Sequence, residues 1–324
     1  MVNVLSSADV PVPSTRHPGA GAGAVGLVLG AVLSVQFGGA VAALLFPRIG
    51  VDGVLTMRLM IAALVLLAVC RPRVRGYRCT DWLLIGGFGV ALAGMNTLFY
   101  HAIELIPLGP AVMLEVLGPL VLSVVTARCV ASWLWAGLAA AGVALLSSVG
   151  FDRLTPAGIG FAVAAGAMWA GYIMASARVG QRFPKVDGLA LAMTAAAVIT
   201  LPSGAGAAGT ALLSPSILAM GAAVALLSTV LPYTLELLAL RRMPTTTFAV
   251  LMSLGPAVAA LAGYVVLHQQ LTTVEGLAIA LVIAANIGAV RTPPRRSTTP
   301  ERRKKVAVPE TTVSGVIVRS PLYE

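Results

Sequence analysis

Apolar residues in this chain form long runs that are almost free of charge, and short polar or basic segments separate them. About 20 apolar residues in a helix cross the hydrocarbon core of a bilayer. The alternating ten-residue segments that are typical of membrane β-barrels are absent from the sequence. We therefore predict an all-α polytopic membrane protein with ten transmembrane helices. They occupy residues 25–46, 54–70, 82–102, 108–126, 130–149, 156–177, 186–201, 217–240, 245–267 and 274–290.

Composition supports the same class. The chain has 324 residues, of which 58% are hydrophobic and only 10% are charged, whereas soluble domains carry about 25% charged residues. Residues 1–23 are rich in Gly, Ala, Pro and Ser and have no basic stretch leading into a cleavable apolar core. We therefore expect residues 1–23 to be a disordered tail rather than a signal peptide.

The basic residues predict the orientation of the chain. Alternate loops differ sharply in their content of Lys and Arg, and cytoplasmic loops hold the excess. One set contains Arg71, Arg73, Arg75, Arg78, Arg128, Arg178, Arg182, Lys185, Arg241 and Arg242; the other contains Arg48 and Arg153. We expect both ends of the chain to be cytoplasmic, in the cytoplasmic membrane. The net charge of +10 then reflects topology, and we expect no nucleic-acid partner.

Two shorter features carry less information. The basic tail 292–324 is predicted to be disordered and cytoplasmic, and attraction of Arg302-Arg303-Lys304-Lys305 to anionic lipid headgroups is the alternative role. Cys70, Cys79 and Cys129 match no metal-binding spacing, so we expect neither a metal nor another cofactor.

A weak internal repeat divides the helices into two sets of five. Gly118-Pro119 follows Pro107 at the same spacing as Gly255-Pro256 follows Pro244. The tripeptide Val-Asp-Gly also recurs, at 51–53 in a predicted outside loop and at 186–188 in a predicted inside loop. An odd number of helices inverts the second copy, so we predict inverted repeats over 24–150 and 151–291. Such repeats place a substrate site near the bilayer midplane.

Two carboxylates lie within predicted spans. Glu115 and Glu236 need a partner or a cavity, because an ionisable group at the centre of a membrane helix costs about 2.5–3.5 kcal/mol. For Glu115 the functional interpretation is a proton site or a contact for a substrate ammonium, and the alternative is a structural carboxylate bonded between helices. For Glu236 the alternative is that it reaches toward Arg241 or Arg242.

Further polar and aromatic residues are candidates for the wall of a substrate cavity. Arg58 either clamps a substrate carboxylate, neutralises Asp52 or anchors its helix. The others share helical faces at spacings of three or four residues, which are as typical of packing as of a site. They are Gln36, Asn96, Tyr100, Trp169, Tyr172 and Tyr233. His101 and His268 are expected near the membrane interface.

The two Gly-Pro pairs fall inside predicted spans. Proline removes a backbone hydrogen bond and bends a helix, and a membrane helix tolerates this where neighbouring groups satisfy the freed carbonyl. We interpret Gly118, Pro119, Gly255 and Pro256 as paired bends that shape the central cavity, with simple packing kinks as the alternative.

Three stretches resemble one known family. They are Arg58-Leu59-Met60-Ile61-Ala62-Ala63-Leu64, then Pro107 to Leu120, and then Leu231-Pro232-Tyr233-Thr234-Leu235-Glu236 with Met243-Pro244-Thr245-Thr246-Thr247-Phe248. The chain is similar to the EamA-type members of the drug/metabolite transporter superfamily, and among these to inner-membrane exporters of threonine and homoserine. The resemblance covers about 25–290 and implies ten helices in two five-helix repeats.

The chain departs from that pattern at three places. Gly255 stands where the exporters have Glu, Thr246 stands where they have Arg, and His268-Gln269 replaces Gly-Glu. These differences leave the cargo and the coupling ion open, but not the fold.

The resulting hypothesis is a secondary transporter that exports small, threonine- or homoserine-like amino acids or related polar metabolites by alternating access, with protons as the candidate coupling ion. Export of another metabolite or a drug is the first alternative. An intramembrane enzyme or a non-transporting scaffold is the second, although H-E-x-x-H and G-x-S-x-G are absent. No Walker motif is present, so ATP is not expected to drive transport. The oligomeric state stays open.

Overall fold

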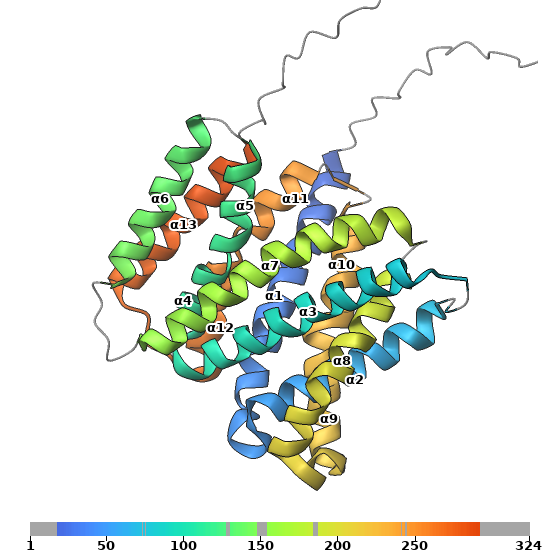
Figure 1. The fold of residues 1–324 in the computed structure, drawn as a ribbon. Helices are drawn as coiled ribbons and strands as arrows, with labels where there is room; N and C mark the ends of the chain where they lie inside the picture. The colour runs from blue at the N-terminus through green and yellow to red at the C-terminus, as the bar shows by residue number, and fades with distance from the viewer. Residues whose placement is uncertain are drawn as a thin grey trace, which may run out of the picture. The chain divides into compact units, whose positions relative to one another are not determined.

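The computed structural model describes residues 18–72, 74, 76–127, 130–147, 154–183, 187–240, 242–243 and 245–291, and every secondary-structure element in these ranges is helical (Figure 1). Within them, nine helical segments are long and apolar enough to cross a membrane. A further helix, with 18 residues, is about 27 Å long at 1.5 Å per residue. These observations confirm a polytopic all-α membrane protein and agree with ten spans.

The first half of the chain contains six helices in five spans. They are α1 (Pro18–Ala43), α2 (Phe46–Cys70), α3 (Cys79–Leu105), α4 (Leu108–Glu115), α5 (Leu117–Ala127) and α6 (Val130–Ser147). The second half contains α7 (Pro156–Arg182), α8 (Asp187–Ala208), the 3₁₀ helix η1 (Gly209–Leu213), α9 (Pro215–Ala225), the π-helical turn η2 (Leu226–Val230), α10 (Leu231–Leu240), α11 (Thr245–Met252), α12 (Gly255–Leu267) and α13 (Thr273–Arg291).

Local sequence explains where several helices begin. Thr155 caps α7, since its hydroxyl accepts a hydrogen bond from the Gly158 N–H at 3.2 Å and Pro156 supplies the fixed φ angle of the first helical residue. At the start of α13, Glu275 Oε2 accepts from the Thr272 N–H at 2.7 Å, and the Thr272 hydroxyl accepts from the Glu275 N–H at 3.2 Å. This reciprocal pair is a capping box.

The fourth span of each half is broken at its Gly-Pro pair. In the first half α4 ends at Glu115 and α5 begins at Leu117, and in the second α11 ends at Met252 and α12 begins at Gly255. Proline cannot donate to the helical ladder. The two interruptions therefore occur at matching positions of the two copies, and the backbone between the helices stays right-handed, at Val116 (φ −63°, ψ −17°) and at Leu254 (φ −75°, ψ −5°).

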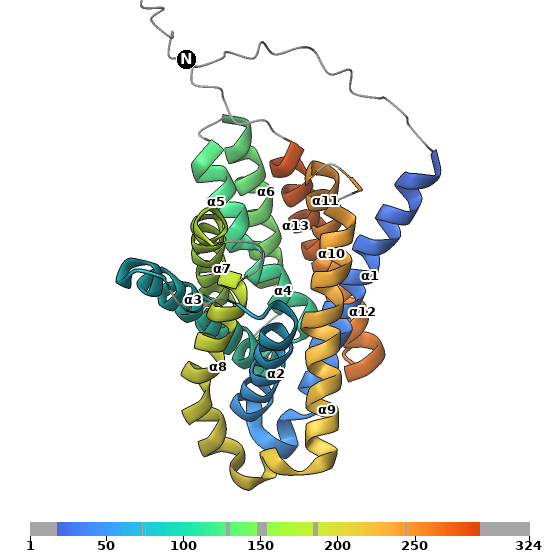
Figure 2. The ribbon, with the colours of Figure 1, turned by 90° about the vertical axis from the view of Figure 1, so that its right-hand side faces the viewer.

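Contacts between the two halves follow a twofold pattern (Figures 1 and 2). The third span packs on the sixth, α3 against α7, and its counterpart is the packing of α1 on η2 and α10. The pairs α2–α8 and α6–α13 map onto themselves when the halves exchange, and the fourth span also packs on its counterpart, the ninth, through α4 and α12. An exchange of this kind is what inverted repeats require.

Two predicted boundaries are wrong. Residues 51–53 are helical rather than in a loop: within Phe46–Cys70 a short first part is followed by a non-helical residue, Gly50, whose φ of 70° suits glycine, and the long part of α2 begins after it. Asp52 directly follows Gly50-Val51 at the start of the long part of α2, and Asp187 is the first residue of α8. The two Val-Asp-Gly tripeptides therefore still lie at matching helix starts, although Val186 is outside the described residues. The first helix, α1, begins at Pro18, which lies within the segment 1–23 that was predicted to be a tail.

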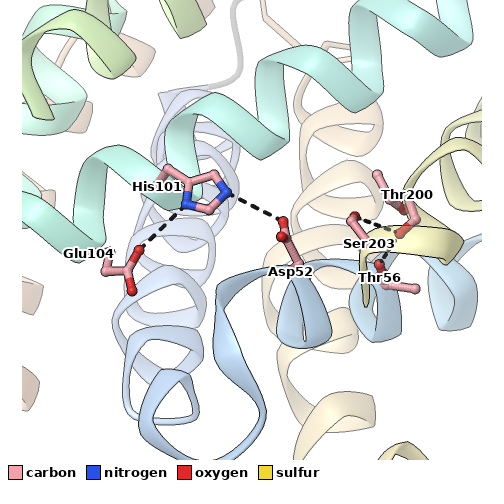
Figure 3. Close-up of polar contacts among 6 residues, drawn as sticks. All are labelled: Asp52, Thr56, His101, Glu104, Thr200 and Ser203. Carbon is pink, nitrogen blue, oxygen red and sulfur yellow. Dashed lines mark hydrogen bonds and ion pairs between the residues drawn. The ribbon is translucent and has the colours of Figure 1, made fainter. Parts of the chain in front are cut away.

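The helix α8 is also longer than the predicted 186–201, because it continues past Pro202 to Ala208. Side-chain hydroxyls gather at this point on α8, as Figure 3 shows. The Thr200 carbonyl accepts hydrogen bonds from the hydroxyls of Thr56 at 2.8 Å and Ser203 at 3.0 Å. A Cβ at Gly204 would collide with Thr56. Close packing of α8 on α2 therefore supports the helix around its proline.

Candidate functional site

A cavity of about 280 Å³ lies between the two halves of the helical bundle. Residues of α1, α2, α3 and α4 line it from the first half, and residues of α7, η2, α10, α11 and α12 line it from the second. Drug-sized ligands occupy pockets of about 300–1,000 Å³. This cavity is smaller, so it suits a small metabolite.

The structure brings together eight of the nine substrate or coupling residues predicted from the sequence. The lining of the cavity includes Gln36, Arg58, Asn96, Tyr100, Glu115, Trp169, Tyr172 and Glu236. The side chain of Tyr233 lies outside the described part of the chain. Residues far apart in sequence, on six different spans, thus share one space.

Arg58 is held in place by two neutral side chains of α3. Its Nη1 donates a hydrogen bond to the Tyr100 hydroxyl at 2.8 Å, and its Nη2 donates to Asn96 Oδ1 at 3.0 Å. Asn96 is itself oriented, because its Nδ2 donates to the Leu92 carbonyl at 2.8 Å. The Arg58 Nε is buried and has no hydrogen-bond partner among the described residues. The guanidinium is therefore fixed, keeps its charge unbalanced by these partners and retains one unused donor.

Asp52 does not neutralise Arg58, which corrects one of the alternatives drawn from the sequence. Its carboxylate lies 3.4 Å from His101 Nε2, and the other ring nitrogen of His101 lies 3.5 Å from Glu104 (Figure 3). The His101 ring is also 5.6 Å from that of Phe161 on α7. This group joins α2, α3 and α7 outside the cavity.

Both membrane carboxylates face the cavity. Glu115 ends α4 at the break in the fourth span, and Glu236 lies in the middle of α10. Among the described residues, neither carboxylate has a hydrogen bond or a salt bridge, and Arg242 does not pair with Glu236; Arg241 lies outside those residues. The cavity thus contains one guanidinium and two carboxylates. The two carboxylates are available to bind a molecule that occupies the cavity.

Two glycines position Glu115. A Cβ on Gly118 would overlap the Gly166 carbonyl of α7, and a Cβ on Gly166 would meet the Glu115 carbonyl at 2.5 Å. The junction between α4 and α5 therefore rests directly on the backbone of α7, which only glycine permits. Gly118, Pro119 and Pro256 do not line the cavity; they lie at the interruptions of the fourth and ninth spans.

Gly255 differs from its counterpart Gly118. It lines the cavity, and a Cβ there would lie 3.7 Å from Gln36 Nε2, which is an ordinary contact. The two Gly-Pro breaks match in sequence position but differ in how tightly they pack.

Sequence reasoning missed most of the apolar lining, because apolar side chains do not stand out in a membrane protein. The missed residues are Val32, Val35, Gly39, Met95, Phe99, Val112, Val116, Ser228, Pro232 and Met252. Ser228 is the one polar side chain among these residues. Its only sequence signal is that it lies four residues before Pro232, which belongs to a stretch already singled out.

A second ion pair lies at the far end of α3 and α7 from His101. Arg182 Nε donates to Asp81 Oδ1 at 2.7 Å, and its Nη2 donates to Asp81 Oδ2 at 3.3 Å. Asp81 is buried, and it also caps α3 by accepting from the Arg78 N–H. The pair fastens the third span to the sixth and takes no part in the cavity.

Comparisons with known proteins agree with this architecture. Residues 156–291 match the model of the EamA-like transporter family. The threonine/homoserine exporters RhtA of Escherichia coli (strain K12) and Salmonella typhimurium (strain LT2) are each 40% identical to this chain over 268 residues, which cover 82% of the chain and 90% of the relative. One crystal structure of a protein, 20% identical, matches with a TM-score of 0.52 over 83% of this chain and 96% of that one. At that identity the likeness shows the fold alone.

Proposed function

The chain belongs to the EamA-like transporter family, and we propose that it exports small amino acids of the threonine and homoserine type across the cytoplasmic membrane by alternating access. The observation that carries the proposal is the grouping of Arg58, Glu115 and Glu236 in one small cavity between the two repeats. An amino acid carries a carboxylate and an ammonium, and this cavity offers a partner of opposite charge to each.

Arg58 is proposed to bind the carboxylate of the cargo. A guanidinium binds a carboxylate through directed, charge-assisted hydrogen bonds. Asn96 and Tyr100 fix its orientation before the cargo arrives, and each terminal nitrogen keeps a second N–H that these bonds do not use. A group that is already oriented loses less conformational freedom on binding.

Glu115 is proposed to bind the ammonium of the cargo or to exchange a proton with it. Arg58 balances only one of the two carboxylates, so a cavity that holds a neutral zwitterion keeps one negative charge when both are ionised. A proton on one carboxylate would remove that charge, which is costly within a membrane. This balance favours coupling of export to proton entry, with Glu236 as the second carboxylate.

Relationship to named exporters over most of the chain confirms transport over the intramembrane enzyme and the non-transporting scaffold. Among transporters, an exporter of another metabolite or of a drug is the remaining alternative. The three charged groups favour a charged or zwitterionic cargo over an apolar drug, because an apolar ligand would leave both carboxylates without partners and the charge of Arg58 unbalanced.

We further propose that both ends of the chain are cytoplasmic, on the strength of the basic loops. The side of the membrane that bears Asp81 and Arg182 would then be the inner one.

Flux in reconstituted vesicles tests the proposal. Purified protein in proteoliposomes should exchange labelled threonine across the membrane, and unlabelled homoserine should compete with it. Arg58→Ala should abolish exchange. Movement of an apolar drug with no flux of any amino acid in a panel would favour the alternative cargo instead.

A further inference from the structure

A glutamine of the first span presents an unpaired amide to the cavity. Gln36 on α1 is half-buried and lines the cavity. It makes no hydrogen bond with any residue that the structure describes, and neither its amide nitrogen nor its amide oxygen is fully buried. A molecule in the cavity can therefore reach both atoms. The amide offers two N–H donors and a carbonyl acceptor.

Three other neutral polar side chains of the lining differ from Gln36 in this respect. Asn96 is engaged at both ends of its amide, since it accepts from Arg58 and donates to the backbone of its own helix. Tyr100 also accepts from Arg58 and is completely buried. The side-chain oxygen of Ser228 is buried as well, so a cargo cannot reach it.

The two aromatic side chains that α7 contributes to the lining offer less to a hydroxyl group. The indole of Trp169 can donate a hydrogen bond but cannot accept one. Tyr172 already has a partner, and its ring packs against that of Phe88 on α3 with 5.1 Å between the ring centres. The amide of Gln36, in contrast, is free both to donate and to accept.

The position of Gln36 brings this amide close to a charged group of the cavity. A Cβ on Gly255 of α12 would lie 3.7 Å from Gln36 Nε2 and 4.0 Å from Val112 Cγ1 on α4, so the amide and Val112 flank the same glycine. Val112 and Glu115 both line the cavity. They are three residues apart on α4, and residues at this spacing are neighbours on one helical face. The amide therefore lies beside the part of α4 that is about one helical turn from Glu115.

We propose that Gln36 selects cargo that carries a side-chain hydroxyl, by a hydrogen bond between its amide and that hydroxyl. The inference rests on the proposed export of small amino acids and assigns one residue to the choice among them. Arg58 and the carboxylates bind groups that all amino acids share, so they cannot make this choice. The glutamine side chain is long and flexible, and no described partner holds it. It can therefore follow a hydroxyl on the β carbon, as in threonine, or on the γ carbon, as in homoserine.

Transport of labelled 2-aminobutyrate, threonine and homoserine into proteoliposomes tests the proposal. 2-Aminobutyrate lacks the hydroxyl of both other amino acids and otherwise has the same atoms, so one analogue serves for both. The wild type should prefer each hydroxylated amino acid by about fivefold or more, because a cargo without the hydroxyl leaves the amide unpaired. Gln36→Met, which nearly keeps the length but cannot donate, should bring both ratios to within about twofold. It should do so by weakening the transport of threonine and homoserine, with that of 2-aminobutyrate unchanged.

Gln270→Met is the matched control, since it makes the same substitution at an exposed glutamine between α12 and α13, outside the cavity. It should retain the wild-type preference. Gln36→Met is expected to fold, because the amide that it removes has no partner in the empty protein; the melting temperature of the purified protein checks this. Gln36→Leu, which is apolar but differs in shape, should give the same ratios as Gln36→Met.

The outcomes separate the two proposals. Wild-type protein that moves no amino acid overturns the proposed function, and the inference with it. Wild-type protein that moves threonine and 2-aminobutyrate equally overturns the role of Gln36 alone, and so does a preference that survives in both Gln36 variants. Equal loss of transport for all three amino acids in folded Gln36→Met would also overturn that role, since Gln36 would then support the cavity as a whole.

Discussion

Arg58 and Tyr100 are bound to each other in two ways. The guanidinium donates a 2.8 Å hydrogen bond to the Tyr100 hydroxyl, and its carbon atom lies 5.3 Å from the centre of the same ring. Tyr100 is completely buried, so it forms a rigid support. Because Asn96 holds the other terminal nitrogen, Arg58 has little freedom to leave the cavity. Arg58, for which the sequence left three roles open, is thus part of the wall of the cavity.

Replacements of Arg58 and of its partner Tyr100 should therefore lower the rate of threonine exchange. Lysine keeps the charge but not the planar fork that reaches Asn96 and Tyr100 together, so Arg58→Lys should lower threonine exchange by at least about tenfold, the equivalent of 1.4 kcal/mol. Tyr100→Phe removes one hydrogen bond from the charged guanidinium, of about 1.5–3 kcal/mol, and should lower exchange by about ten- to a hundredfold. Initial exchange rates at several threonine concentrations measure both. Equal rates in wild type and Arg58→Lys would mean that the fork does not bind the cargo.

Glu115→Gln separates proton coupling from binding of the cargo amine. Glutamine keeps the shape and a hydrogen-bonding amide but does not titrate, so net export driven by a pH gradient should be lost or become independent of pH. Threonine exchange without a gradient should survive if Glu115 carries the proton, and it should fall if Glu115 binds the ammonium. Glu236→Gln, measured in the same two assays, shows which carboxylate has which role. Wild-type export with unchanged pH dependence in Glu115→Gln would leave that residue structural.

The two Gly-Pro breaks should respond differently to added volume. A Cβ on Gly118 would overlap the backbone of Gly166, which cannot move aside, so Gly118→Ala should lower stability by about 1–3 kcal/mol or more. Gly255→Ala places its methyl group in ordinary contact with Gln36 and should be tolerated. Thermal unfolding of the two purified variants in detergent makes the comparison. Similar melting temperatures would show that α5 and α7 do not pack as closely as the structure has them.

Much of the fold could be predicted because the membrane imposes simple rules. A span needs about 20 apolar residues, and an ionisable side chain within it needs a reason. The first rule located the helices, and the second singled out Arg58, Glu115 and Glu236, which the structure gathers in one cavity. The resemblance to EamA-type transporters is confirmed by the family match and by the relatives.

The parts that could not be predicted depend on contacts between spans. The helix α8 continues past Pro202, where it packs closely on α2, and the Thr56 hydroxyl there is 144 positions away in sequence from the Thr200 carbonyl that it bonds. At Gly50 the backbone leaves the helical region, but helix resumes directly after it, three residues before the predicted start of the second span. The π-helical turn that contains Ser228 gave no sequence signal, and the Leu227 carbonyl in that turn accepts a hydrogen bond from Ser34 of another span.

The proposed orientation gives opposite predictions for two exposed positions. Thr210 lies in η1, between the seventh and eighth spans, and Gly180 lies near the end of α7, between the sixth and seventh. Since one span, α8, separates them, the two must face opposite sides of the membrane.

In a variant without Cys70, Cys79 and Cys129, a cysteine at Thr210 should react with an impermeant maleimide added to intact cells, and one at Gly180 should react only after the membrane is permeabilised. The physical reason is the excess of Arg and Lys in the loops on the Gly180 side, which the cytoplasmic face retains. A reporter fused after Glu324 should accordingly be active only if it works in the cytoplasm. Labelling at Gly180 but not at Thr210 in intact cells would invert the whole topology, and export would then have to begin from the opposite end of the cavity.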